Sequence, residues 1–167
     1  MLKRDFLRNG SASLVLGAIG LGIVPRFAAP ARAAASDADF PVMKSDAQWR
    51  TQLSPQAYSI LRQQGTERAF TSALNDEHRP GMFHCAGCDN AVYNSETKFD
   101  SGTGWPSFWQ AVSGAIGTHE DRALMMLRVE CHCARCGGHL GHIFDDGPKP
   151  TGKRHCINGV AMTFKPA

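Results

Sequence analysis

Six cysteines are the residues of this chain best suited to chemistry, and four of them form two Cys-x-x-Cys pairs separated by 44 residues. Two such pairs can supply four thiolates to one tetrahedral zinc ion, each at about 2.3 Å. A zinc ion with four protein ligands has no open position for water or substrate, so we expect one structural Zn²⁺ per chain. The expected ligands are Cys85, Cys88, Cys133 and Cys136.

Cysteine pairs also have two other common uses. A thioredoxin-like redox pair needs a strand-to-helix βαβ setting, and the sequence has no such alternation. Six cysteines in an exported chain can instead form three bridges, which would give a disulfide-framed secreted protein. Counting free thiols and metal in the pure protein would separate that alternative from a zinc site.

Cys156 stands outside both pairs, in a run with strand character. Alternate residues of a strand share a face, so Arg154, Cys156 and Asn158 are predicted to point the same way. A guanidinium group beside a thiol favours the thiolate, which is the nucleophilic form, and asparagine adds an uncharged hydrogen bond. The alternative is a structural cysteine buried between core residues, and this run alone leaves both interpretations open.

Two further segments could form a pocket. His139 and His142 lie three residues apart in a glycine-rich stretch and could be general acids, a metal half-site or surface histidines. Trp105 and Phe108 follow Ser101-Gly-Thr-Gly and flank Pro106, in a rigid turn that can present an indole face to a sulfur-bearing methyl group. We expect Trp105 and Phe108 to contact substrate, the alternative being that they cap the core.

The surrounding elements indicate a mainly β domain. Ser45 and Ser54 each precede a short helical pattern, and Pro55 starts the second one. After Pro80-Gly81 the chain consists of short apolar runs divided by glycine and proline, which is typical of antiparallel sheets. These strand-like runs cover residues 82–84, 91–93, 123–129 and 155–164.

The first 35 residues have the composition of an export signal. A basic start, an apolar stretch over residues 14–24 and small residues over 31–35 follow in order. The start Lys3-Arg4-Asp5-Phe6-Leu7 resembles a twin-arginine signal, with the general secretory route as the alternative. We expect the signal to be removed and the protein to be periplasmic. The apolar stretch falls short of the roughly 20 residues of a spanning helix, so no stable membrane anchor is expected.

The remaining chain divides into a linker, residues 36–44, and one domain, residues 45–167. The formal charge is +3, but residues 1–33 hold five of the 18 basic residues and only one of the 15 acidic ones. The rest is therefore close to neutral, which argues against nucleic acid as a partner.

Four segments together resemble the methionine-R-sulfoxide reductases of the B type, over about residues 45–164. They are the first Cys-x-x-Cys pair, residues 104–108 (Gly-Trp-Pro-Ser-Phe), residues 133–148 with Gly-His-Leu-Gly-His-Ile-Phe-Asp-Asp-Gly-Pro, and residues 152–158. The resemblance implies two packed antiparallel sheets with short N-terminal helices and a structural zinc away from the reaction centre. It also implies thiol-dependent reduction of methionine-R-sulfoxide, free or in oxidised proteins. We expect a monomer that a thioredoxin-like dithiol recycles.

The resemblance further implies a role for each candidate site residue. Cys156 would be the nucleophile that becomes a sulfenic acid, with His139 and His142 facing the sulfoxide oxygen. Arg154 and Asn158 would support it, and Trp105 would lie against the substrate methyl group.

One position departs from the family pattern. Many members have cysteine where this chain has Thr103, and that cysteine resolves the sulfenic acid. Cys131 is the one cysteine left for this task. Either Cys131 resolves the sulfenic acid, or Cys131 is buried and an external thiol resolves it.

The rival function is that of an inactive zinc-ribbon-like binding module, in which Cys156 and the histidines only pack. Consumption of methionine sulfoxide would separate the two.

Overall fold

The computed structural model describes residues 40–122 and 127–167. The predicted export signal, residues 36–39 of the linker and residues 123–126 of the predicted apolar run lie outside the described residues. In the part that is described, no helix is both long and apolar enough to span a membrane.

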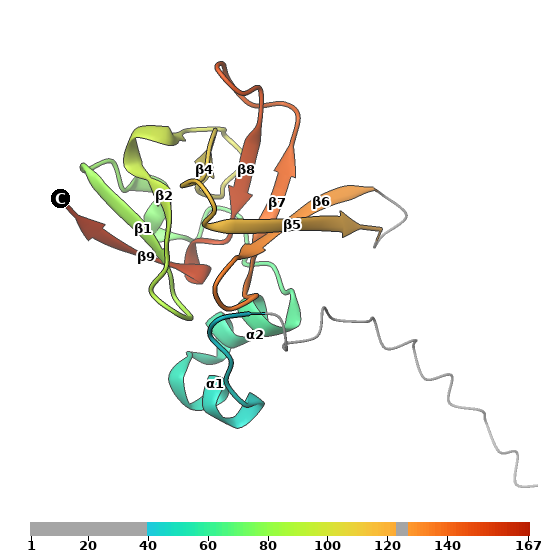
Figure 1. Cartoon of the computed structure of the whole chain (residues 1–167). Helices are drawn as coiled ribbons and strands as arrows, with labels where there is room; N and C mark the ends of the chain where they lie inside the picture. The colour runs from blue at the N-terminus through green and yellow to red at the C-terminus, as the bar shows by residue number, and fades with distance from the viewer. Residues whose placement is uncertain (1–39, 123–126) are drawn as a thin grey trace, which may run out of the picture. The chain divides into compact units, whose positions relative to one another are not determined.

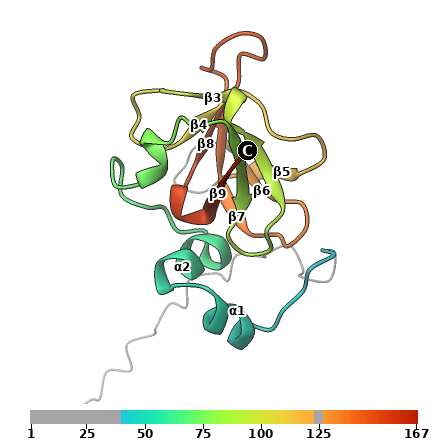
Figure 2. The same cartoon turned by 90° about the vertical axis from the view of Figure 1, so that its left-hand side faces the viewer.

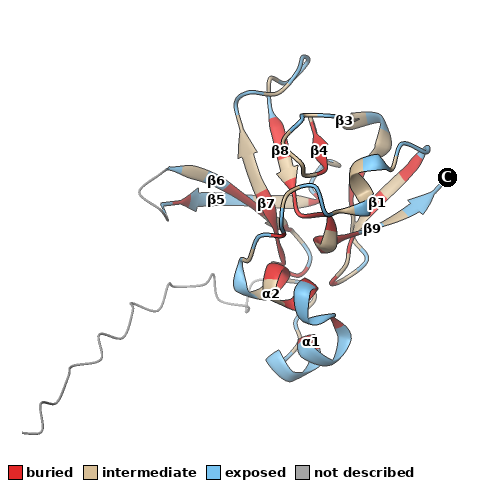
Figure 3. Ribbon diagram, turned by 180° about the vertical axis from the view of Figure 1, so that it is seen from behind, coloured by how far each residue is buried: buried red, intermediate tan, exposed pale blue. Residues whose placement is uncertain are grey.

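Two short helices precede the strands, as the sequence predicts. Helix α1 (Asp46–Gln52) begins after Ser45, whose hydroxyl accepts a hydrogen bond from the Gln48 amide, while the Ser45 amide donates to the Gln48 side chain. This reciprocal capping box fixes the start of the helix. Helix α2 (Pro55–Gln63) begins after Ser54. Figure 3 shows that α1 is largely exposed and that α2 buries one face; the buried residues of α2 are Ala57, Tyr58, Ile60 and Leu61.

The strands form two antiparallel sheets, so the predicted fold class is confirmed. The small sheet has the order β2-β1-β9, and the large sheet has the order β3-β4-β8-β7-β6-β5 (Figure 1). Figures 1 and 2 both place the two helices at one end of the strands.

The small sheet comprises β1 (Gly81–Cys85), β2 (Ala91–Asn94) and β9 (Met162–Pro166). The large sheet comprises β3 (Lys98–Phe99), β4 (Ser107–Phe108), β5 (Ile116–Asp121), β6 (Arg128–Cys133), β7 (His139–Phe144) and β8 (Arg154–Ile157). The short 3-10 helices in the described part of the chain are η2 (Ala73–Asp76), η3 (Ser95–Thr97) and η5 (Gly159–Ala161).

Aromatic side chains join the two sheets. The ring of Phe108 in the large sheet stacks on Tyr93 of the small sheet, with centroids 4.3 Å apart, and meets the edge of Phe83 at 5.0 Å. All three side chains are fully buried. Burial of each large apolar side chain stabilises the fold by about 1.5–3 kcal/mol, so this contact is a main link between the sheets.

The predicted single run over residues 155–164 is wrong in one respect, because the chain changes sheet within it. Strand β8 belongs to the large sheet and β9 to the small one, with η5 between them. The buried Glu67 carboxylate accepts hydrogen bonds from the amides of Gly159 (2.5 Å) and Val160 (3.1 Å). A Cβ atom at Gly159 would lie 1.8 Å from the hydroxyl of Ser72, so only glycine fits this turn.

Candidate active site and metal centre

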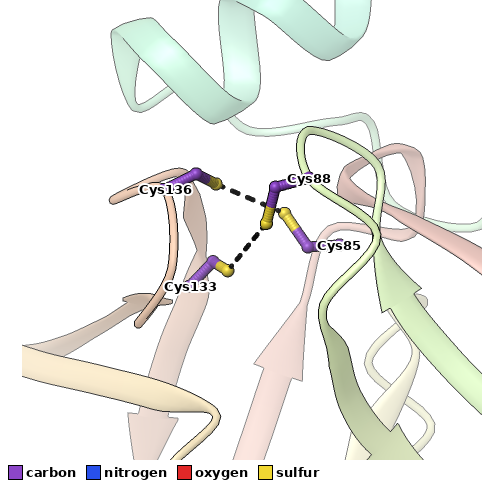
Figure 4. Close-up of side chains that lie close together, drawn as sticks. All are labelled: Cys85, Cys88, Cys133 and Cys136. Carbon is purple, nitrogen blue, oxygen red and sulfur yellow. Dashed lines mark hydrogen bonds between the residues drawn. The ribbon is translucent and has the colours of Figure 1, made fainter. Parts of the chain in front are cut away.

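The four paired cysteines meet at one point, although they come from different sheets (Figure 4). Cys85 and Cys88 lie at the end of β1 and in the turn that follows it. Cys133 and Cys136 lie at the end of β6 and in the turn after it. The cluster therefore links the small sheet to the large sheet.

Sulfur distances distinguish a metal site from disulfides. The Cys85 and Cys136 sulfurs are 3.7 Å apart, and the Cys88 and Cys133 sulfurs are 3.5 Å apart. Tetrahedral zinc with bonds of about 2.3 Å requires sulfur separations of about 3.8 Å, whereas a disulfide bond measures about 2.05 Å. All six cysteines are free thiols in the structure. The geometry fits a four-coordinate metal ion and does not fit a framework of three bridges.

Cys156 lies in the middle of the large sheet. It pairs directly with His142 on β7 and with Ser107 on β4. Residues directly opposite each other in an antiparallel sheet point to the same face, so the thiol and the imidazole are neighbours. The predicted alternation along β8 is confirmed, because Cys156 and Asn158 line one pocket while His155 turns to the core and hydrogen-bonds with Tyr93 at 3.2 Å.

The pocket beside Cys156 is small and largely apolar. It has a volume of about 140 Å³, and it brings together four of the residues predicted from the sequence. Its lining residues are Thr66, Trp105, Arg128, Gly141, His142, Phe144, Cys156 and Asn158. A second hollow of about 290 Å³ also borders Trp105 but contains no cysteine. We therefore assign the chemistry to the smaller pocket.

Trp105 and Asn158 are held by the segment that follows α2. The indole Nε1 of Trp105 donates to the Glu67 backbone carbonyl at 3.1 Å. Asn158 accepts from the Glu67 amide at 2.9 Å and donates to the Leu140 carbonyl at 3.0 Å. These bonds fix the orientation of both side chains before any ligand arrives.

Each histidine has its own carboxylate partner. His142 Nε2 donates to Asp121 at 3.0 Å, and burial lowers the pKa of His142 despite that bond, which raises it. His139 Nδ1 donates to Glu130 at 2.5 Å. His139 is buried behind His142, with ring centroids 5.4 Å apart, and does not line the pocket.

A β-bulge explains why both histidines lie on one side of the sheet. Three residues apart on a regular strand, they would point to opposite faces. The register shifts between Cys131 and His132 of β6, so that Leu140 is an extra residue of β7. The bulge restores a common face for His139 and His142.

Arg154 is held close to Cys156. Its guanidinium forms two hydrogen bonds of 2.9 Å with Asp146 and stacks over Phe144 at 4.5 Å from the ring centroid. The positive charge of Arg154 lowers the pKa of Cys156, and the polar groups of Thr103 and Arg154 beside the sulfur act in the same direction. Burial has the larger effect, and it raises the pKa of this thiol above its ordinary value. Arg154 thus favours the thiolate, as expected from the sequence, and burial opposes it.

Phe108 is not at the site. The sequence predicts that it contacts substrate, but it pairs with His155, whereas its neighbour Ser107 pairs with Cys156. Alternation then turns Phe108 to the opposite face, where it is fully buried against Tyr93. The alternative of a core residue is correct for Phe108, and Phe144 lines the pocket instead.

Cys131 lies on the core face of the sheet. It is fully buried, pairs with Gly141 and contacts the Tyr93 hydroxyl at 3.9 Å. Burial raises the pKa of Cys131 to about 12. Since Gly141 pairs in turn with Ile157, the neighbour of Cys156, the Cys131 thiol points away from the face that carries Cys156.

Several site residues were not identified from the sequence. Glu67, Asp121 and Glu130 are buried carboxylates whose partners lie 7 to 93 residues away, so no local pattern reveals them. Arg128 bonds to Asp121 at 2.7 Å and also lines the pocket. For Phe144 a signal was present, because it lies two residues after His142 on the same strand and shares its face.

Known proteins share this arrangement of segments. A family model described as the SelR domain matches residues 53–166. A peptide methionine sulfoxide reductase MsrB from Agrobacterium fabrum is 53% identical over 126 residues, covering 75% of this chain and 93% of that protein. MsrB proteins from Thiobacillus denitrificans and Methanosarcina mazei are 52% and 48% identical, each covering 74% of this chain and 94% and 89% of their own lengths. The chain therefore belongs to the MsrB family of peptide methionine sulfoxide reductases.

Proposed function

We propose that this protein reduces methionine-R-sulfoxide, free or within oxidised proteins, to methionine, with Cys156 as the nucleophile. The observation that supports this most strongly is the pocket that joins Cys156, His142, Trp105 and Asn158. Hydrogen bonds orient three of them, His142, Trp105 and Asn158. An inactive binding module has no need to set a thiol directly opposite an imidazole in such a pocket. Family membership supports the same activity.

The chemistry balances without any group outside the pocket. The Cys156 thiol loses its proton, its sulfur attacks the sulfoxide sulfur, and the sulfur–oxygen bond breaks. The oxygen takes up a proton from the neighbouring acid and leaves as hydroxide. Hydroxide then adds to the Cys156 sulfur as the new sulfur–sulfur bond breaks, which leaves a sulfenic acid on Cys156 and releases the substrate as a thioether. Oxide is a poor leaving group unless protonated, so a neighbouring acid is required. His142, directly opposite Cys156, is placed to carry that proton, and His139 packs behind it.

Selection of one epimer follows from three fixed walls. The indole of Trp105 suits the substrate methyl group, His142 suits the oxygen, and the remaining side-chain stem must leave through the pocket opening. The direct test supplies separated R and S sulfoxides to the protein with a dithiol donor. We expect consumption of the R epimer alone. Equal consumption of both epimers, or of neither, would contradict the proposed function.

The pH dependence should show a broad plateau. The pKa of His142 is lowered from 6.5 and that of Cys156 is raised from 9.0, in both cases by burial. At a pH between the two pKa values, His142 and Cys156 together hold one proton. A minor fraction then has the proton on His142, and this form, a thiolate beside an imidazolium, is the reactive one. Below the pKa of His142 both groups are protonated and the thiolate is lost; above the pKa of Cys156 both are deprotonated and the acid is lost.

We therefore expect the rate of a single turnover to stay level from at least pH 6.5 to 9.0 and to fall on either side. Enzyme in excess over substrate removes the donor thiol from the measurement. His142→Ala should be slower by roughly 10²–10⁴ and should lose the plateau, because its rate then follows the Cys156 thiolate alone and rises with pH up to the pKa of Cys156. A narrow optimum of the single-turnover rate, centred between the ordinary pKa values of histidine and cysteine, would show that His142 and Cys156 do not share a proton.

Cys131 is not the resolving thiol in this proposal, and an external thioredoxin-like dithiol reduces Cys156 directly. Wild type and Cys131→Ser are oxidised with one equivalent of substrate, and the remaining free thiols are counted without releasing the metal. Because Cys131 is buried on the opposite face, we expect each protein to lose one thiol. A loss of two thiols in wild type and one in the variant would instead identify an internal Cys131–Cys156 disulfide.

The metal at the four cysteines is proposed to be zinc, one per chain, with a purely structural role. Four thiolate ligands at tetrahedral separations are typical of structural zinc and leave no position for substrate. The metal supplies no step of the reaction, since the pocket around Cys156 is lined by none of its four ligands.

We also propose that the protein works in the periplasm as a monomer, exported folded. The support is the composition of residues 1–35, which resembles a twin-arginine signal. Cells expressing the full chain and its Arg4→Lys variant are fractionated. The variant precursor is expected to stay in the cytoplasm; unchanged export would indicate the general secretory route.

A further inference from the structure

A second group of metal-binding side chains lies on the outer strands of the large sheet. His119 on β5 and Glu130 and His132 on β6 each offer a ligand atom, and these atoms all lie within 4.8 Å of one another. None of the three residues belongs to the four-cysteine cluster or lines the pocket beside Cys156.

Strand pairing brings the three side chains to one face. His119 lies directly opposite Glu130, so their side chains share a face. Glu130 and His132 are two residues apart on β6 and share that face, whereas Cys131 and Cys133 point to the other. The rings of His119 and His132 are 5.7 Å apart with an interplanar angle of 37°.

Gly117 makes room for the third ligand. It pairs with His132, and a Cβ atom at Gly117 would lie 2.5 Å from His132 Nε2. The absence of a side chain lets the His132 imidazole lie over β5 beside His119. Phe40 meets the same imidazole edge-on at 5.6 Å and confines it from another direction.

The carboxylate between the histidines is buried and incompletely bonded. Glu130 is only 2% exposed, and its Oε1 atom is fixed by His139 Nδ1 at 2.5 Å. Its Oε2 atom has no hydrogen-bond partner among the described residues, although it makes an ion-pair contact with His119 Nε2. A buried carboxylate oxygen without a hydrogen bond is costly, and buried charges of this kind are usually paired or bound to metal.

We propose that His119, Glu130 and His132 bind a second divalent transition-metal ion of the zinc type. Two imidazoles and one carboxylate suit Zn²⁺, Co²⁺, Ni²⁺ and Cu²⁺, and three protein ligands leave at least one position for water. The His119 side chain is 43% exposed, so the ion enters from solvent. The hydrogen bond from His139 orients the carboxylate with Oε2 toward the two histidines.

Cobalt is a suitable probe, because its visible absorption reports its ligands. Zinc-loaded full-length protein, freed of excess metal, is titrated with Co²⁺ in a buffer without thiols, and bound cobalt and retained zinc are measured. We expect one Co²⁺ per chain with ligand-field bands, no thiolate charge-transfer band and no release of zinc. The failure of Co²⁺ to bind, or cobalt uptake matched by zinc release and a thiolate band, would overturn the proposal.

Three variants locate the bound ion. His119→Gln removes one ligand at an exposed position, and Gly117→Ala removes none but displaces His132; each should weaken Co²⁺ binding by more than about tenfold, the loss typical of a disturbed metal shell. His78→Gln, the matched control, removes an exposed imidazole elsewhere and should bind as wild type does. Undiminished binding by His119→Gln would refute the site, and Gly117→Ala tests the same geometry with all donors retained.

Discussion

Cys156→Ser is expected to lose all measurable reduction of methionine sulfoxide, a decrease of more than about 10⁴-fold. A serine hydroxyl cannot form the thiolate that attacks the sulfoxide sulfur, nor can it carry the oxygen as a sulfenic acid. Loss of the nucleophile removes the reaction path and leaves only the weak effects of binding. The measurement is a single turnover of the R epimer with enzyme in excess.

The same variant should fold normally. Cys156 is not a ligand of the four-cysteine cluster, and serine is close to it in size, so zinc content and Tm should match wild type. Cys131→Ser is the matched control, because it removes a thiol from the opposite face of the same sheet and should keep the reduction step. Activity retained by a folded Cys156→Ser protein would show that another residue carries the reaction.

Loss of the metal is expected to have the largest effect on stability. Structural zinc contributes about 10–16 kcal/mol in small zinc peptides, whereas whole domains are stable by only about 5–15 kcal/mol. We expect Cys88→Ser to be metal-free and to be unfolded or to melt far below wild type. Cys88 is the most accessible of the four ligands, so its replacement causes little loss of packing beyond the loss of the metal.

Elemental analysis and thermal unfolding of the same samples decide this result. Cys131→Ser again serves as the control and should retain one zinc per chain. Wild-type protein that is active, stably folded and free of metal would contradict a structural zinc. A Cys88→Ser protein that is metal-free but as stable as wild type would do the same.

Local patterns predicted the parts of the fold that depend on neighbouring residues. Ser45 and Ser54 begin both helices, because an N-cap is satisfied within three residues of itself. The Cys-x-x-Cys spacing identified the metal cluster, since each pair forms its own turn. The alternation of Arg154, Cys156 and Asn158 also follows from the strand period alone.

Features that depend on strand register could not be predicted from the sequence. The closeness of Phe108 to Trp105 along the chain predicts a place in the pocket, but pairing with His155 turns Phe108 to the core. His139 and His142 share a face only because of the bulge at Leu140, and no residue type near Leu140 indicates that bulge. Burial raises the pKa of Cys156, and this burial cannot be read from the sequence. The adjacent Arg154, which is evident from the sequence, lowers the pKa of Cys156.

The four-cysteine cluster joins two sheets through pairs of cysteines that are far apart along the chain, and this affects the order of folding. Closing a loop of 44 residues costs chain entropy of about 3 kcal/mol. Thiolates can bind zinc before either sheet exists, so a metal-bound denatured chain starts with that loop closed. Refolding from denaturant should then be faster with zinc present at the start than with zinc added later. A bound zinc ion would then increase the rate at which the two sheets associate as well as their final stability.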